Sequence, residues 1–156
     1  MINPTKDQIK EIADDLDCGM RCFYNKVTGE IKAIPDYESM IYADESLFEE
    51  DLNDLDENWS DYFEFEKYPS HESFQVMVDF AESVDNVKLQ DRLFNALNRS
   101  KPFRNFKWQI DNSGEYRELW FAYKRDRYIN FVKKQIERLN RHEERLREEN
   151  NEMAKD

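Results

Sequence analysis

The sequence predicts an α+β fold that is mainly helical, with a small antiparallel sheet of about three strands near the N-terminal half and a long C-terminal helix. Short β-prone runs around turn residues lie before Lys67, whereas apolar residues recur at helical spacing after Ser70. The 3 Trp, 8 Tyr and 11 Phe provide a core that a disordered chain of similar polarity lacks. We expect one α+β domain over residues 1–141 and a polar helical tail over residues 142–156.

The N-terminal region predicts a capped helix followed by a β-hairpin. Thr5 and Gln8 fit a capping box, in which each side chain accepts a hydrogen bond from the backbone of the other residue. Residues 20–25 and 30–34 are β-prone and flank a turn containing Gly29, which can adopt positive φ. These two runs therefore predict antiparallel strands joined by a tight turn.

Between the hairpin and the helical region, the chain alternates aromatic with acidic residues. The run 62–66 places Phe63 and Phe65 on one face and carboxylates on the other, which predicts a third strand. Asp44 is a candidate N-cap for a helix whose large apolar residues, ending at Trp59, are spaced by four, three and four positions.

From Ser70 onward the periodicity is helical. Asn86 is a candidate N-cap for the second of these helices, and Pro102 can open the third because a missing N–H costs nothing at a helix start. The stretch 112–115 resembles a second capping box, so a long helix is expected to begin there and to carry apolar residues as far as Leu139.

The string PFRNFKW combines three aromatic rings with two cations. On a helix, Phe103 and Phe106 share one face, which we expect to pack into the core, whereas Arg104 and Lys107 face water. Trp108 belongs to neither face. Periodicity therefore assigns the two Phe rings to the core and leaves the cations without an assigned role.

Charge is unevenly distributed along the chain. The overall net charge of −12 argues against a surface that faces DNA or an anionic membrane throughout. Residues 36–91 carry 2 basic and 18 acidic side chains, whereas residues 92–141 carry 13 basic and 5 acidic ones. No signal peptide and no apolar run long enough to span a membrane are found, so we expect a cytoplasmic protein that does not associate with membranes.

Residues 79–135 resemble a bacterial family known only as uncharacterised protein family 0158. The matching segments are Leu93–Leu97, Pro102–Lys107, Gly114–Phe121 and Tyr123–Lys124. The resemblance implies a bacterial-type cytoplasmic protein with an α+β fold. It implies no activity.

The acidic segment contains one string that resembles a calcium-binding loop. Asp54, Asp56 and Asn58 occupy the first, third and fifth positions of such a loop. However, Trp59 stands where the loop requires Gly, and Phe65 stands where it requires Glu. We therefore interpret these residues as a solvated acidic helix face and expect no metal site.

Other catalytic patterns are incomplete. Cys18 and Cys22 are the two cysteines and cannot form a zinc site without both His71 and His142, so we expect buried thiols. No Gly-x-Ser-x-Gly elbow and no phosphate-binding Gly-rich loop is found. The sequence indicates no catalytic residue and no cofactor, and an enzyme is the less favoured class.

A candidate nucleic-acid-binding surface remains in the basic region, where cations could contact phosphates and a Trp ring could stack on a base. Its residues are Arg99, Lys101, Arg104, Lys107, Trp108, Lys124 and Arg127. Two alternatives compete with this hypothesis. The cations could pair with the acidic middle of the chain, or they could form an ordinary solvated helix surface.

The sequence favours a non-catalytic protein-interaction or accessory module with a charge-polarised surface, whose partner is another protein or a second copy of the chain. The first alternative is a nucleic-acid-binding accessory protein that uses residues 99–134. The second is a metal-dependent enzyme built on residues 44–66.

Overall fold

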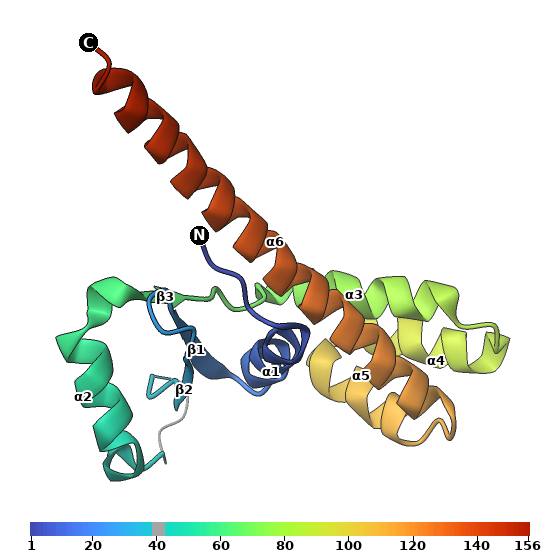
Figure 1. Cartoon of the computed structure of the whole chain (residues 1–156). Coiled ribbons are helices and arrows are strands. Elements are labelled where there is room, and N and C mark those ends of the chain that lie inside the picture. Colours follow the sequence, from blue (N-terminus) through green and yellow to red (C-terminus); the bar gives the residue numbers. More distant parts are fainter. Residues whose placement is uncertain (39–42) are drawn as a thin grey trace. The chain divides into compact units, whose positions relative to one another are not determined.

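The computed structural model describes residues 1–38 and 43–156 (Figure 1). It confirms the expected fold class, a mainly helical α+β fold with a three-stranded antiparallel sheet and a long C-terminal helix. The elements in chain order are α1 (Lys6–Asp17), β1 (Met20–Asn25), β2 (Ile31–Pro35), two short 3-10 helices (Glu45–Phe48 and Trp59–Asp61) on either side of α2 (Glu49–Glu57), β3 (Tyr62–Glu64), α3 (Ser70–Ser83), α4 (Val87–Leu97), α5 (Pro102–Asp111) and α6 (Tyr116–Met153).

Two compact units make up the described chain. The first unit comprises Met1–Lys67 and Tyr128–Asp156, and the second unit comprises Tyr68–Arg127. Helix α6 contributes residues to both units.

The sheet of the first unit has the strand order β2-β1-β3, and both pairings are antiparallel. The expected hairpin is confirmed, with Tyr24 opposite Ile31 and Gly29 at a φ of +75°. Asn25 shapes the turn as well, because its Oδ1 atom accepts hydrogen bonds from the backbone nitrogens of Val27 and Thr28.

Helix α1 covers this sheet. The capping box of Thr5 and Gln8 forms as expected, and the buried face of the helix consists of Ile12, Ala13 and Leu16. These three side chains belong to a core that also contains Ile2, Cys22, Tyr24, Phe65, Val132 and Ile136. The core of the first unit thus joins α1 and the sheet to the middle of α6.

Two side-chain amides of α6 bind extended segments of the first unit. The Gln135 amide accepts a hydrogen bond from the backbone nitrogen of Glu66 at 2.8 Å and donates one to its carbonyl oxygen at 3.0 Å. Asn140 makes the same pair of bonds to the backbone of Ile2, at 2.8 and 2.9 Å. Each amide therefore satisfies a backbone donor and a backbone acceptor, as a neighbouring strand would.

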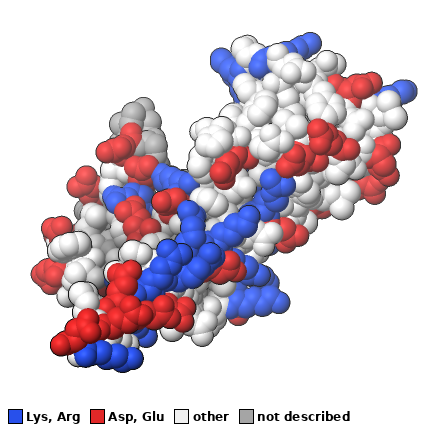
Figure 2. Space-filling view, turned by 90° about the horizontal axis from the view of Figure 1, so that it is seen from above, with Lys and Arg blue, Asp and Glu red and all other residues white. Residues whose placement is uncertain are grey.

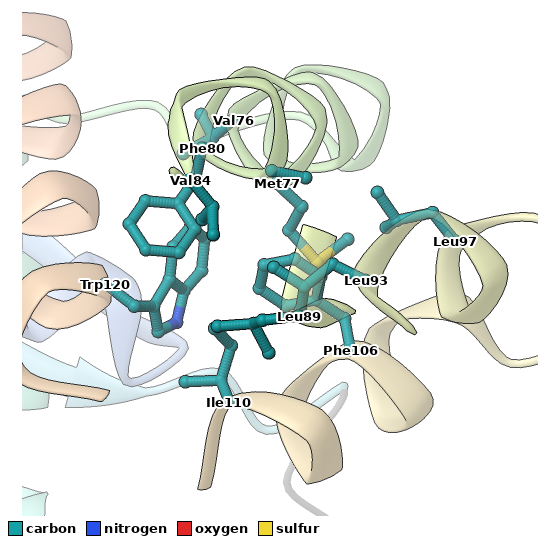
Figure 3. Close-up of a cluster of buried hydrophobic side chains, with 11 residues drawn as sticks. Val76, Met77, Phe80, Val84, Leu89, Leu93, Leu97, Phe106, Ile110 and Trp120 are labelled. Carbon is teal, nitrogen blue, oxygen red and sulfur yellow. The ribbon is translucent and has the colours of Figure 1, made fainter. Parts of the chain in front are cut away.

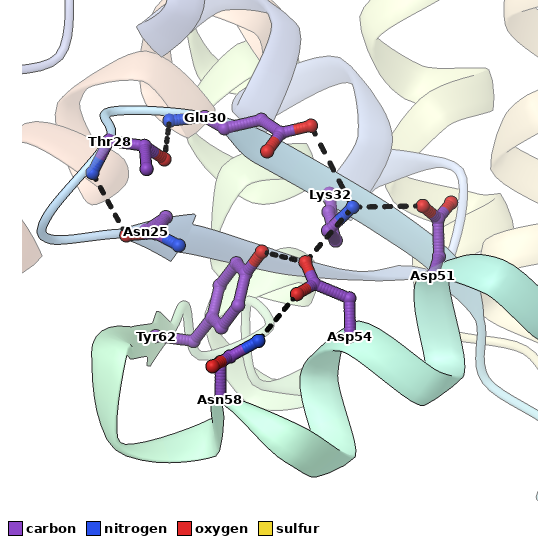
Figure 4. Close-up of polar contacts among 8 residues, drawn as sticks. All are labelled: Asn25, Thr28, Glu30, Lys32, Asp51, Asp54, Asn58 and Tyr62. Atoms are coloured by element: carbon purple, nitrogen blue, oxygen red, sulfur yellow. Dashed lines mark hydrogen bonds and ion pairs between the residues drawn. The ribbon is translucent and has the colours of Figure 1, made fainter.

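Helix α2 has no buried residue and is joined to the sheet by polar contacts (Figure 4). The Lys32 ammonium, whose side chain is 10% exposed, lies 3.0 Å from Asp51 and 3.3 Å from Asp54. Asp54 also accepts hydrogen bonds from Tyr62 and Asn58. Burial alone lowers the pKa of Lys32, but its hydrogen bonds to the two aspartates outweigh burial and raise the pKa.

The acidic segment differs from the expected single helix. Asp44 is an N-cap, as expected, but it caps the 3-10 helix Glu45–Phe48, from which α2 continues. The apolar spacing predicted one helix as far as Trp59, whereas α2 ends at Glu57 and Trp59 begins the second 3-10 helix. The Trp59 side chain is 75% exposed.

The second unit is a helical cluster built from α3, α4, α5 and the beginning of α6. Its buried residues are Val76, Met77, Phe80, Ala81, Val84, Leu89, Leu93, Leu97, Phe106, Ile110 and Trp120 (Figure 3). The Trp120 ring centre lies 5.2 Å from that of Phe80 and 4.9 Å from that of Phe106, both in edge-to-face geometry. Such aromatic pairs add to the stability gained from burial alone.

Local signals placed most helix starts of this unit correctly. Asn86 caps α4 through a hydrogen bond from the backbone nitrogen of Leu89, and Pro102 is in the first turn of α5. The expected capping box at 112–115 is wrong. The Asn112 side chain donates instead to the carbonyl oxygen of Trp108 and thus caps the end of α5.

Phe103 and Phe106 have different environments. Phe106 is 1% exposed, which confirms its expected place in the core. Phe103 is 45% exposed, so the expectation that it packs inward is wrong, and its ring contacts that of Phe74 at the edge of the cluster at a centroid distance of 6.4 Å. Helical spacing placed both rings on one face of α5, but the neighbouring helices cover only the part of that face that contains Phe106.

Helix α6 extends to Met153. From Glu144 onward every side chain is exposed. Among the described residues, no helix combines the length and the apolar character that crossing a membrane requires.

Candidate functional site

The candidate site lies in the second unit, on the hairpin formed by α4 and α5. Lys101 occupies the turn with a φ of +55°, in the left-handed region, and Pro102 begins the next helix. The Asn105 side chain donates a hydrogen bond to the carbonyl oxygen of Ser100 at 2.9 Å. The left-handed turn and this hydrogen bond hold α4 and α5 together as a helical hairpin.

Two shallow hollows adjoin each other on this hairpin. The smaller, of about 190 Å³, is lined by residues of both α4 and α5, and the larger, of about 500 Å³, is lined by the turn and α5. Asn105 and Trp108 line both hollows. Trp108 is 61% exposed, so a large indole stands in water between two depressions.

Five cations line these hollows. Arg92 and Arg99 belong to the smaller one, and Lys101, Arg104 and Lys107 belong to the larger one. In the part of the chain that the structure describes, none of these five side chains forms an ion pair or a hydrogen bond. We call these five cations, together with Asn105 and Trp108, the basic–aromatic surface.

One carboxylate, Asp111, also lines the larger hollow. Its Oδ1 atom lies 3.4 Å from Nε of Arg117, so part of its charge is already compensated. The surface therefore has a clear excess of positive charge.

Helical geometry explains why these residues share one surface. Arg104, Lys107, Trp108 and Asp111 are spaced by three, one and three positions, which places them side by side on α5, while Phe106 points into the core. Arg92 and Asn95 lie three positions apart on α4, and Arg99, in the turn that follows this helix, lines the same hollow.

Arg127, which the sequence assigned to the candidate surface, has a different role. Its Nη1 atom lies 2.9 Å from Oδ2 of Asp79 and 3.2 Å from the hydroxyl oxygen of Tyr123. Hydrogen bonds from Gln75 and from Arg127 lower the pKa of Asp79. Arg127 therefore joins α6 to α3 inside the second unit and does not line either hollow.

Lys124 is also engaged within the second unit. Its ammonium lies 5.8 Å from the ring centre of Trp120 and 5.7 Å from that of Phe121, within the range of cation–π attraction. Of the seven predicted residues, the hollows bring together five. These are Arg99, Lys101, Arg104, Lys107 and Trp108.

Sequence reasoning missed Arg92 and Asn105. Arg92 follows Leu89 by three positions and precedes Leu93 by one on an amphipathic helix, so its exposed place beside Asn95 could have been predicted from helical spacing. Asn105 carries no comparable signal, because its place beside the hollows follows from the turn that packs α4 against α5.

The acidic segment offers a different arrangement. Asp54 is held by Lys32, Tyr62 and Asn58, as Figure 4 shows. Among the described residues, no group of three or more His, Cys, Asp or Glu side chains is arranged to hold a metal ion.

The two cysteines differ in exposure. Cys22 is buried, as expected, and burial together with the nearby Asp15 carboxylate raises the pKa of its thiol to about 12. Cys18 is exposed, because it follows the last turn of α1, so the expectation that both thiols are buried is wrong for Cys18.

Charge clusters are visible on the molecular surface. Figure 2 shows a group of Lys and Arg side chains near the middle of this face, with Asp and Glu side chains directly beside it and over the rest of the face.

Comparison with known protein families identifies a match that covers most of the chain. The model of a family described as "Uncharacterised protein family (UPF0158)" matches residues 4–153. The resemblance inferred from residues 79–135 is thereby confirmed and extends over nearly the whole chain. No curated protein and no solved structure matches this chain.

Proposed function

The chain belongs to the uncharacterised protein family UPF0158, and we propose that it is a non-catalytic accessory module that binds nucleic acid through its basic–aromatic surface. The observation that carries this proposal is the exposed Trp108 between two hollows lined by five cations that have no ion-pair partner among the described residues. We also propose that the protein is a bacterial cytoplasmic protein, and nucleic acid is present in that compartment.

The freedom of these cations supports nucleic acid over an internal structural role. A cation already paired with a carboxylate must lose that contact before it binds a phosphate, whereas an unpaired cation exchanges only water and counterions. Arg104 and Lys107 are exposed and adjacent to one another on α5. The acidic residues of the chain concentrate elsewhere, between residues 36 and 91.

Fluorescence-anisotropy titration tests the proposal. The full chain is titrated into labelled single-stranded RNA and duplex DNA at about 50 and 200 mM salt, a range over which phosphate contacts weaken measurably. We expect binding at the lower salt, a steep loss at the higher salt, and loss of binding in the double variant Arg104→Glu/Lys107→Glu.

A charge-matched control is the double variant Lys6→Glu/Lys10→Glu. Both lysines are exposed on α1 in the first unit, and the change in net charge is identical. The control should bind as the unmodified chain does. No binding at 50 mM salt would reject the proposal, and equal losses in both double variants would show that net charge, not this surface, is responsible.

A second candidate function, docking of a second copy of the chain, is supported by the exposed Trp59 beside α2. Trp59 and Leu47 are large apolar side chains in an acidic segment and are 75% and 77% exposed, and aromatic side chains are enriched at protein interfaces. The acidic segment of one copy complements the basic–aromatic surface of another. Sedimentation velocity should then detect a dimer at low salt that Trp59→Ser weakens, and a monomer throughout would reject this candidate.

A further inference from the structure

We infer that the basic–aromatic surface accepts a single strand rather than a duplex, with one base stacked on Trp108 and the adjoining phosphates held by the cations of the two hollows. This inference rests on the proposed function and specifies the ligand of the same surface. In this arrangement Trp108 distinguishes a single strand from a duplex, and the cations supply most of the affinity.

The environment of Trp108 supports a stacking role. In the described part of the chain, its indole packs against no other aromatic ring and makes no cation–π contact. The opposite holds for Trp120, which contacts Phe80 and Phe106 in the core. Keeping an indole 61% exposed forgoes its burial, and a base can supply the missing contact.

The hollows on either side of Trp108 give the strand a path. A nucleotide backbone that passes the indole has phosphates before and after the stacked base, and each hollow provides cations for one side. Arg92 and Arg99 serve the smaller hollow, whereas Arg104 and Lys107 serve the larger one. Such an alternation of ring and cations is how single strands are bound without sequence preference.

Amide side chains near the indole suit an unpaired base. Gln109 and Asn95 line the smaller hollow, and neither side chain is hydrogen-bonded in the described structure. Their amides can donate to and accept from a base edge that is not occupied by Watson–Crick pairing. In a duplex the bases are stacked on one another, so their faces are closed to Trp108.

The experiment compares a 12-nucleotide single strand of mixed RNA sequence with the corresponding duplex, using the full chain at about 50 and 200 mM salt. We expect tighter binding of the single strand. Contacts to three to five phosphates predict a loss of affinity of roughly 20- to 130-fold between the two salt concentrations.

Two variants of Trp108 separate stacking from charge. Trp108→Leu keeps an apolar side chain but removes the ring, and should weaken single-strand binding roughly 5- to 150-fold while leaving duplex binding unchanged. Trp108→Phe keeps a ring and should retain most of the affinity. Because the side chain is exposed, both variants should fold, and circular dichroism verifies this.

A spectroscopic readout locates the contact. Stacking on Trp108 should quench its fluorescence, so the quenching seen when unlabelled single strand is added to the unmodified chain should be absent in Trp108→Phe. Trp59 and Trp120 are present in both proteins and provide the common background.

The outcomes separate this inference from the proposed function. Equal binding of single strand and duplex, unaffected by Trp108→Leu but abolished by Arg104→Glu/Lys107→Glu, would overturn the inference and leave nucleic-acid binding in place. No binding of either strand type at the lower salt would overturn both. Equal affinity for polyglutamate would identify a surface for acidic proteins and would likewise overturn both.

Discussion

The guanidinium of Arg127 lies 2.9 Å from the Asp79 carboxylate, and this ion pair joins α6 to α3 within the second unit. Each side chain is about one-third exposed. The pair shows that a cation from the basic region of the sequence can stabilise the folded structure. It distinguishes Arg127 from Arg104, which forms no ion pair among the described residues.

This distinction predicts opposite effects for two Arg variants. Arg127→Met keeps the apolar part of the side chain but loses the ion pair, and should lower the free energy of unfolding by about 1 kcal/mol without changing nucleic-acid affinity. Arg104→Met should leave stability unchanged and weaken binding. Urea denaturation and anisotropy titration measure both quantities, and a loss of binding in Arg127→Met with intact folding would contradict the assignment.

The two Phe residues of α5 should respond differently to truncation. Phe106→Ala removes a ring that is 1% exposed and should cost about 3–5 kcal/mol of stability. Phe103→Ala removes a half-exposed ring at the cluster edge and should cost about 1 kcal/mol. Thermal and urea unfolding give the two values, and equal costs would contradict the burial seen in the structure.

We expect Gln135 to stabilise the first unit, because its side chain is hydrogen-bonded to both the backbone nitrogen and the carbonyl oxygen of Glu66. Gln135→Leu preserves the apolar volume but leaves a donor and an acceptor without partners, so it should cost about 1–3 kcal/mol. Asn140→Leu is the matched control. It breaks the same kind of contact at Ile2, but Asn140 is half-buried whereas Gln135 is buried, so its effect on the urea midpoint should be smaller.

The polar attachment of α2 should depend on pH through Asp54. Hydrogen bonds from Tyr62 and Asn58, together with Lys32, lower the pKa of Asp54 below its ordinary value of about 3.9. The resulting stabilisation is present above the unfolded-state pKa and is lost as the pH falls through the lower folded-state pKa. The stability difference between the unmodified chain and Asp54→Asn should therefore be largest near neutral pH and shrink below about pH 4.

Asp56→Asn is the control for this titration, because Asp56 is exposed and its carboxylate makes no hydrogen bond or ion pair in the described structure. Its effect on stability should be small at every pH. A difference for Asp54→Asn that stays constant from pH 7 to pH 2 would show that the lost contact is not ionic.

The cysteines should differ in reactivity toward a thiol reagent. The exposed Cys18 should react in the folded protein, whereas Cys22 is buried and its pKa of about 12 leaves almost no thiolate at neutral pH. Absorbance with a disulfide reagent should therefore report one thiol in buffer and two in denaturant. Cys18→Ser should abolish the reaction in buffer.

Much of the fold was determined by local sequence signals. Thr5, Asn86 and Pro102 fix helix starts because a cap acts on backbone groups within one turn, and Gly29 permits a turn that few other residues adopt. Periodicity identified Phe106 as a core residue. The family could also be recognised from the sequence, because it depends on the order of residues and not on their contacts.

Only the tertiary structure decided which of several side chains of the same type are buried, which form ion pairs and which stay exposed. Periodicity gives the face of a helix, but neighbouring helices set how much of that face is covered, so Phe103 lies at the edge while Phe106 is buried. Likewise, pairing of a cation requires a carboxylate that is close in space. Asp79 is 48 residues from Arg127 in the sequence and contacts it, whereas Arg104 meets no carboxylate among the described residues.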